Sequence, residues 1–155
     1  MGIEIERKFL LLGEAWKKLA QGIRYRQGYL STTKESTVRV RTIEDTGYLT
    51  VKGESKGATR SEFEYPIPVE DANAMLDQLC AKPLIEKKRY KIEYEGFTWE
   101  VDEFFGENQG LVVAEVELAS EDQVYAKPEW VGAEVTEDKR YFNSNLAQHP
   151  YCRWE

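Results

Sequence analysis

Charged side chains occupy alternate positions at the start of the chain. Between residues 3 and 9, Glu4, Glu6 and Lys8 alternate with apolar residues. Alternate residues of a strand share a face, so two carboxylates and an ammonium group would line up on one side of it. Such a row is either a solvated surface or a site that holds metal ions and phosphates.

The same alternation recurs along the chain, and in several rows charges of one sign lie two residues apart. The rows are Arg39 and Arg41; Thr50 and Lys52; Arg60, Glu62 and Glu64; Lys87, Arg89 and Lys91; Glu100 and Asp102; and Glu115 and Glu117. A β-sandwich with solvated outer faces would also alternate in this way. Like charges held side by side are unfavourable, however, unless a group of opposite sign lies between them. The grouping by sign therefore favours a site.

These residue types suit phosphoryl transfer, which needs mainly positioning and charge neutralisation. Paired arginines such as Arg39 and Arg41 bind phosphate oxygens well, and carboxylates hold hard divalent cations. Carboxylates without histidine fit Mg²⁺ or Mn²⁺ better than Zn²⁺. Since His149 is the only histidine, neither a Ser/His/Asp triad nor a histidine-based zinc site is expected.

Composition limits the other classes of function. The 155 residues fit one domain, 1–155, and the net charge of -7 argues against general nucleic-acid binding. Cys80 and Cys152 form neither a disulfide framework nor a metal-ligand spacing. There is no signal peptide and no apolar run of membrane-spanning length, so we expect a cytoplasmic protein without a membrane partner.

The periodicity predicts a mainly β (α+β) domain. Strands are expected near residues 2–12, 23–33, 36–44, 47–53, 59–67, 84–95, 97–105 and 111–119. Tight turns are expected at Asp45-Thr46-Gly47 and at Glu95-Gly96. Eight antiparallel strands with a few peripheral helices favour a closed or nearly closed barrel, because closure removes exposed strand edges.

Four short helices are predicted, near residues 14–20, 70–81, 121–126 and 137–142. In the first, Trp16, Leu19 and Ala20 form the expected buried side. The second carries Leu79 and Cys80 at helical spacing. The fourth has Thr136 as its expected N-cap.

The charged rows resemble a known family. Glu4-Ile5-Glu6-Arg7-Lys8 resembles the EXEXK signature of the CYTH superfamily, the triphosphate tunnel metalloenzymes. Further segments resemble the motifs of this family in the same order: residues 39–41, 49–53, 60–64, 87–90, 102, 115–117 and 134–141. The resemblance covers about residues 2 to 143.

The resemblance implies an eight-stranded antiparallel β-barrel that forms a polar tunnel and binds a triphosphate with Mg²⁺ or Mn²⁺, as two ions. It makes these residues the metal-site acids: Glu4, Glu6, Glu115 and Glu117 as the principal ones, with Glu62, Glu64 and Asp102 as further acids that bind metal or orient basic groups. It makes these residues the phosphate binders: Lys8, Arg39, Arg41, Lys52, Lys87 and Arg89, with Arg60 and Lys139 as further partners.

Compact bacterial members similar to this chain are mostly inorganic triphosphatases, which cleave tripolyphosphate to pyrophosphate and phosphate. In those, a lysine–tyrosine pair has been proposed to activate the attacking water, and Lys87 and Tyr29 are the matching candidates. Direct activation by a metal ion is the alternative. The resemblance also leaves open a nucleoside or thiamine triphosphatase, a class IV-type adenylate cyclase, and a non-catalytic polyphosphate- or nucleotide-binding module. A homodimer is a further expectation, and residues 144–155 either cross a tunnel mouth or form surface.

Overall fold

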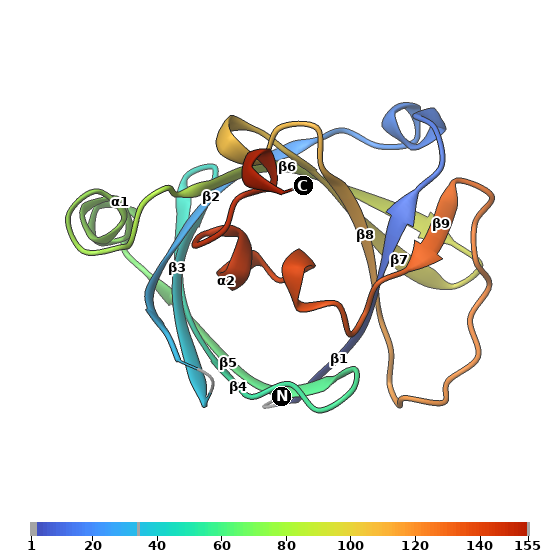
Figure 1. Ribbon diagram of the computed structural model, residues 1–155, viewed down its shortest axis with the longest axis horizontal. Helices are drawn as coiled ribbons and strands as arrows, with labels where there is room; N and C mark the ends of the chain where they lie inside the picture. Colours follow the sequence, from blue (N-terminus) through green and yellow to red (C-terminus); the bar gives the residue numbers. More distant parts are fainter. Residues whose placement is uncertain (1–2, 34, 155) are drawn as a thin grey trace.

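Eight antiparallel strands close into a barrel in this computed structural model, which describes residues 3–33 and 35–154 (Figure 1). The strands are β1 (Ile3–Leu11), β2 (Ile23–Thr32), β3 (Ser36–Ile43), β4 (Thr46–Gly53), β5 (Thr59–Ile67), β6 (Ile85–Tyr94), β7 (Phe97–Phe104) and β8 (Val112–Glu117). Their order is β5-β4-β3-β2-β6-β7-β8-β1, and pairing of β1 with β5 closes the ring. The predicted eight-stranded barrel is confirmed.

Strand β1 divides its pairing between two neighbours. Its first residues pair with β5, where Glu4 lies opposite Arg60, and its middle pairs with β8, where Lys8 lies opposite Glu115. A ninth strand that the periodicity did not predict, β9 (Val131–Glu134), adds to the far end of β1 outside the ring. The barrel therefore closes at the strand that carries the first row of charges.

Of the two predicted hairpin turns, one lies where it was expected and the other is shifted along the sequence. Glu95 and Gly96 form the turn between β6 and β7. Between β3 and β4, the turn is Glu44-Asp45 rather than Asp45-Thr46-Gly47, because Ile43 pairs with Thr46. Gly47 has a different role: a Cβ there would lie 2.8 Å from Ala72 Cβ, so its absence lets a helix approach the strand.

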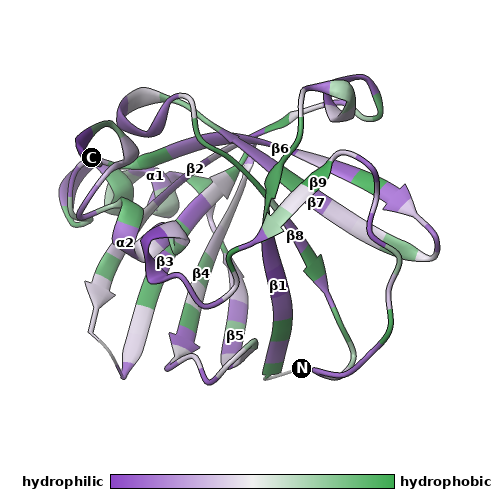
Figure 2. Cartoon of the chain, turned by 45° about the vertical axis from the view of Figure 1, so that its right-hand side comes forward, coloured by the Kyte–Doolittle hydropathy of each residue, from purple (hydrophilic) through white to green (hydrophobic). Residues whose placement is uncertain are grey.

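The main helix, α1 (Val69–Gln78), covers the outer face of β3 and β4. Ala72 and Leu76 pack there on Val40, and Cys80 joins them just beyond the helix. The helix ends before residue 79, so Leu79 is exposed, not buried as its spacing predicted. In Figure 2 the strands carry alternating hydrophilic and hydrophobic bands, as their period of two requires.

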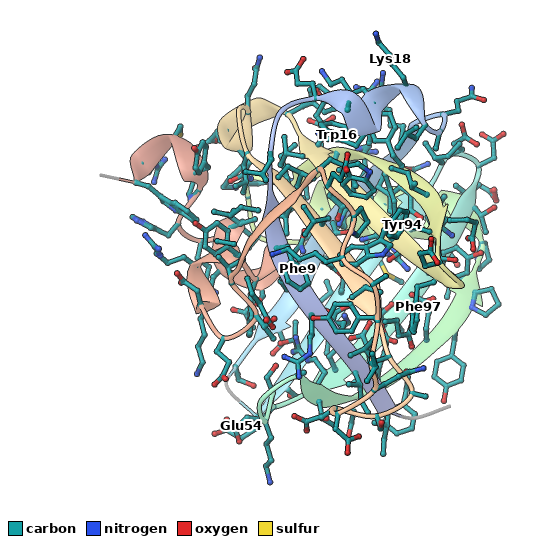
Figure 3. All side chains as sticks on the ribbon, turned by 90° about the vertical axis from the view of Figure 1, so that its right-hand side faces the viewer. Phe9, Trp16, Lys18, Glu54, Tyr94 and Phe97 are labelled. Carbon is teal, nitrogen blue, oxygen red and sulfur yellow. The ribbon has the colours of Figure 1, made fainter. Side chains whose placement is uncertain are left out.

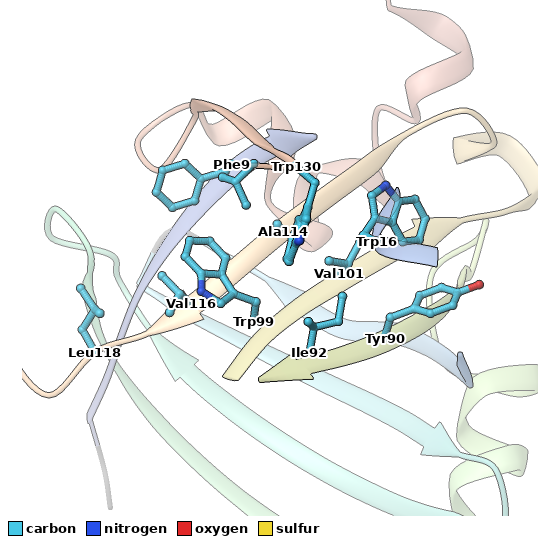
Figure 4. Close-up of a cluster of buried hydrophobic side chains, with 11 residues drawn as sticks. Phe9, Trp16, Tyr90, Ile92, Trp99, Val101, Ala114, Val116, Leu118 and Trp130 are labelled. Atoms are coloured by element: carbon cyan, nitrogen blue, oxygen red, sulfur yellow. The ribbon is translucent and has the colours of Figure 1, made fainter. Parts of the chain in front are cut away.

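The largest apolar cluster also lies outside the barrel, on β1, β6, β7 and β8 (Figure 4). Trp99 is fully buried and contacts the rings of Phe9 and Trp130, with centroids 5.5 and 6.1 Å away. Figure 3 shows Phe9 and Phe97 on this side of the barrel. The largest hydrophobic cluster is therefore built on the outer face of these strands.

On this side of the molecule, two of the predicted helices differ from the observed structure. Residues 121–126 form a turn and an irregular segment, because Tyr125 lies against Phe9 and Trp99, with centroids 6.3 and 6.0 Å away. The first predicted helix is one turn of 3₁₀ helix, η1 (Ala15–Lys18). Trp16 is buried in it, but Leu19 lies beyond its end and is exposed.

The C-terminal segment crosses one end of the barrel (Figure 1). It contains η3 (Lys139–Tyr141), α2 (Asn143–Leu146) and η4 (Tyr151–Arg153), and η2 (Gly106–Asn108) lies beside η4. Tyr141 and Leu146 pack on Tyr29, Phe104 and other residues from the strand ends. Of the two arrangements expected for residues 144–155, the described residues 144–154 show the one in which they cross an end of the barrel.

Only residues 139–141 of the predicted helix 137–142 are helical, and their cap is Asp138, whose carboxylate accepts from Arg140 N at 3.1 Å. Thr136 is not the cap, because its hydroxyl oxygen accepts from Lys8 N at 3.0 Å. Across the described ranges 3–33 and 35–154, we find no helix with the length and apolar character needed to span a membrane.

Candidate active site

The barrel interior holds a cavity of about 240 Å³ whose lining is mostly charged. Most predicted site residues line it: Glu4, Glu6, Lys8, Tyr29, Arg39, Arg41, Lys52, Arg60, Glu62, Glu64, Lys87, Arg89, Glu115 and Glu117. The strands bring them together because every second residue points inwards once the ring is closed. Asp102 and Lys139 do not line the cavity.

Lys8 forms a bridge between two carboxylates of the cavity wall. Its Nζ lies 2.9 Å from Glu115 Oε1 and 3.2 Å from Glu6 Oε1. Burial opposes the charge on Lys8, but Glu115 and Glu6 hold its pKa well above the ordinary value. Burial likewise opposes ionisation of Glu6, but Lys8 keeps the pKa of Glu6 below normal. Burial and the nearby Glu6 raise the pKa of Glu115.

Negative charge is in excess near the closure of the barrel. Burial, followed by Glu4 and Glu6, raises the pKa of Glu117. Lys52 is shared between two acids, with Nζ 3.1 Å from Glu4 Oε1 and 3.5 Å from Glu62 Oε2. A cation placed here would relieve the repulsion that raises the pKa of Glu117.

The same acids do not form a preassembled cage. In the part of the chain that the structure describes, no three acidic, histidine or cysteine side chains gather into a metal-binding group. Lysines account for this, since Lys8 and Lys52 separate the carboxylates that they bridge. The donor set is nevertheless oxygen only and anionic, which is the chemistry that Mg²⁺ and Mn²⁺ prefer.

Positive charge is in excess on the opposite strands. Arg39 and Arg41 both reach Glu64 Oε2, at 3.4 and 3.1 Å, so two guanidinium groups share one carboxylate. The Nε atoms of both arginines are buried without a hydrogen-bond partner in residues 3–33 and 35–154. Burial, Arg39 and Arg89 lower the pKa of Arg41 to about 10. Unpartnered donors and surplus charge fit an anion in the cavity.

Asp102 lies behind the cavity wall and is 2% exposed. Its oxygens accept from Arg89 Nε and Nη2 at 2.8 and 2.9 Å and from Lys87 Nζ at 2.8 Å. Of the two roles expected for this acid, the contacts match orientation of basic groups. Burial lowers the pKa of Lys87 to about 7, with Asp102 opposing and Arg89 reinforcing the shift.

Tyr29 and Lys87, the predicted water-activating pair, both line the cavity. The Tyr29 hydroxyl accepts from Gln27 Nε2 at 3.3 Å. Arg60 also lines the cavity, and its Nε donates to Gly53 O at 3.2 Å. Lys139 is exposed on η3, outside the cavity.

Several lining residues were not predicted from the sequence. Asn143 Oδ1 accepts from Lys87 Nζ at 3.3 Å, and the Phe142 ring lies 5.9 Å from both Lys8 Nζ and Arg60 Cζ. Phe142 ends the helix expected near residues 137–142 and Asn143 lies beyond it, so no strand periodicity could place either residue in the cavity. Glu100 could have been found, because it lies two residues from Asp102 and therefore on the same face of β7.

Comparisons with known proteins agree on one family. A family model described as the CYTH domain matches residues 2–151. The chain is 60% identical over 97% of both sequences to an inorganic triphosphatase of Acetivibrio thermocellus. It is 40% identical to an inorganic triphosphatase of Nitrosomonas europaea, over 93% of this chain and 96% of the relative. A crystal structure of an inorganic triphosphatase superposes with a TM-score of 0.68 at 38% identity, covering 93% of each chain.

Proposed function

This chain belongs to the CYTH domain family, and from that premise we propose that it hydrolyses inorganic tripolyphosphate to pyrophosphate and phosphate inside its barrel. The observation that carries the proposal is that one cavity contains both an acidic and a basic region. Carboxylates gather near Glu117 and guanidinium groups gather near Arg41, within the same 240 Å³. A short polyanion with bound cations matches both halves.

Four acids would hold the divalent metal: Glu4, Glu6, Glu115 and Glu117. The raised pKa values of Glu115 and Glu117 support this assignment, because a bound cation would favour the ionised carboxylates. Bound Mg²⁺ or Mn²⁺, as two ions, would supply charge neutralisation of the phosphate oxygens. Glu62 and Glu64, which already bind Lys52 and the arginines, would orient these basic groups.

The basic residues would hold the phosphate chain. Arg39 and Arg41 would use their unpartnered Nε groups, while Lys52, Arg60 and Arg89 would neutralise further oxygens. Lys8, already engaged with two acids, would contact phosphate and keep these acids apart. Lys139 lies outside the cavity and is left out of this proposal.

Lys87 would take the proton of the attacking water. With a pKa of about 7, its amine is neutral in a large fraction of molecules near neutral pH. The water oxygen would bond to a terminal phosphorus as the proton passes to Lys87 Nζ, and the bridging P–O bond would break with its electrons on the pyrophosphate. Tyr29, at the same cavity, would donate a hydrogen bond to the water or to a phosphate oxygen.

The choice of substrate rests on the relatives. The relatives from Acetivibrio thermocellus and Nitrosomonas europaea are both named inorganic triphosphatases, and the match to the first covers 97% of that relative's length. Solved structures below 25% identity, one of them described as a putative adenylate cyclase, share the fold alone. Cytoplasmic location and a homodimer stay predictions.

One parallel assay tests the proposal. The purified protein, with Mg²⁺ or Mn²⁺, is offered tripolyphosphate, ATP and thiamine triphosphate, and released phosphate is measured. We expect the highest kcat/KM for tripolyphosphate and no turnover after chelation of the metal. A kcat/KM for ATP equal to or above that for tripolyphosphate contradicts the proposal. Cyclic AMP would favour a cyclase, and binding without phosphate release would favour a binding module.

A further inference from the structure

Three basic side chains of the cavity gather around one aromatic ring. Tyr25 lies on β2 and is 3% exposed. The Cζ atoms of Arg89 and Arg41 lie 4.9 and 5.2 Å from its ring centroid. Lys87 Nζ lies 5.8 Å from the same centroid. All three distances are within the range of a cation–π contact.

The barrel order explains this gathering. β2 lies between β3, which carries Arg41, and β6, which carries Lys87 and Arg89. Tyr25 is directly opposite Lys87 in the β2–β6 pairing. Its ring therefore occupies the inner face between two strands whose basic residues point into the same cavity.

The acids near these cations are unevenly distributed. Asp102 binds both Lys87 and Arg89, whereas the one acid that pairs with Arg41 in residues 3–33 and 35–154 is Glu64, which Arg39 also reaches. A further carboxylate would hold Arg41 in place but would cancel the charge that a phosphate needs. An aromatic face attracts a cation through its quadrupole and carries no net charge, so it can hold the cation without neutralising it.

We propose that Tyr25 is a positioning residue: its ring holds the three cations at the cavity wall and leaves their charges available to phosphate oxygens. The inference rests on the proposed function for the identity of the anion. It extends that function to a residue that does not itself line the cavity.

The test varies the ring and keeps its shape. Tyr25→Phe keeps the negative face of the ring, and Tyr25→pentafluorophenylalanine reverses it in a side chain of nearly the same size. We expect Tyr25→Phe to bind tripolyphosphate within about twofold of the unaltered protein. The fluorinated variant should bind about tenfold more weakly, because cation–π contacts between buried groups are lost. Calorimetry without metal gives Kd, and steady-state assays with Mg²⁺ should show a larger change in KM than in kcat.

A second tyrosine gives the matched control. Tyr90 lies on β6 outside the barrel, with its ring 5.1 Å from that of Trp16. Tyr90→pentafluorophenylalanine should leave the tripolyphosphate Kd unchanged, even if it lowers Tm. Melting curves for every variant show whether it is folded.

Two outcomes would overturn the inference. Equal Kd values for the Phe and fluorinated variants at position 25 would mean that the ring face does not act on the cations. A large loss in Tyr25→Phe would mean that the hydroxyl group acts instead. If the unaltered protein binds tripolyphosphate without hydrolysing it, the proposed function fails, but the series of Kd values still decides the role of Tyr25.

Discussion

Lys87 Nζ lies 2.8 Å from Asp102 Oδ2, at a depth where both side chains are almost inaccessible to solvent. An ion pair at this distance would ordinarily keep a lysine charged. Here burial lowers the pKa of Lys87 to about 7 in spite of Asp102, and Arg89, which binds the same carboxylate, lowers it further. The pair therefore combines a fixed position with a proton that can leave near neutral pH.

We expect kcat to rise with pH through about 7 and then to level off. The reason is that Lys87 accepts a proton only when neutral, and its neutral fraction grows as the pH passes its pKa of about 7. Lys87→Arg stays charged and should lower kcat about 100-fold or more. Phosphate release at saturating tripolyphosphate, from about pH 5 to about pH 9, measures this.

Lys88→Arg is the control for this prediction, because Lys88 is the next residue of β6 and points to the other face. It should keep both the activity and the pH profile. A flat profile in the unaltered protein, or an active Lys87→Arg variant, would assign water activation to another group, with a metal ion as the first alternative.

We expect Asp102→Ala to lower the free energy of unfolding by about 3–5 kcal/mol, because it leaves Lys87 and Arg89 buried without their shared anion. Arg89 and Lys87 hold the pKa of Asp102 below its ordinary value, although burial opposes this. The contribution of Asp102 is thus complete above about pH 4, where an unfolded aspartate is ionised, and is lost as the pH falls from there. Urea unfolding at neutral and acid pH measures both effects.

Glu103→Ala provides the comparison for Asp102, since Glu103 lies on the outer face of β7 and forms a partly exposed pair with Lys17. Its effect should be below about 1 kcal/mol. Similar losses for the two variants would show that the buried pairing around Asp102 contributes little to stability.

We expect Glu4→Gln and Glu117→Gln to abolish turnover and to leave the protein folded. Each substitution removes a carboxylate from the acid-rich end, where a divalent ion would bind. Glu117→Gln also relieves the repulsion that raises the pKa of Glu117, so Tm should not fall. Assays with Mg²⁺ or Mn²⁺ and melting curves check this. Glu86→Gln, at an exposed position of β6, is the control and should be fully active. Full activity of both Glu4→Gln and Glu117→Gln would contradict the assignment of these acids to a metal site.

We expect Asn143→Ala to lower kcat about tenfold and to change KM little. Asn143 Oδ1 accepts from Lys87 Nζ at 3.3 Å, so its loss frees the amine to rotate away from the cavity. Asn145→Ala is matched to it, because Asn145 lies on the same helix and its side-chain amide donates to the Lys139 carbonyl instead of contacting the cavity. Equal effects of the two substitutions would mean that α2 itself is disturbed.

The eight strands and the inward residues could be predicted from the sequence, because a period of two fixes which face a residue takes. Arg39 and Arg41, for example, had to share one face of β3. The depth of a residue could not be predicted in the same way. Asp102 and Glu100 lie on the same face of β7, yet only Glu100 lines the cavity. Asp102 lies behind the wall, because Lys87 and Arg89 enclose the Asp102 carboxylate.

The parts that the sequence did not reveal are held by contacts between distant segments. Tyr125 fixes an irregular segment on Phe9 and Trp99, where a helix was predicted. Asn143 reaches Lys87 across 56 positions in the sequence. Neither contact has a local periodic signal, so only the folded chain shows that the C-terminal segment belongs to the cavity.

Two of the three apolar clusters lie outside the barrel, around Trp99 on one side and Leu76 on the other, and the third closes one end of the barrel around Phe104. Along the charged part of the cavity, outer packing and ligand chemistry therefore use opposite faces of the same strands. Substitutions of lining residues on which no buried partner depends can then change the size or charge of the accepted ligand while the outer packing keeps the chain folded. Such a barrel is evolvable, because selection can alter much of its lining without altering the outer core.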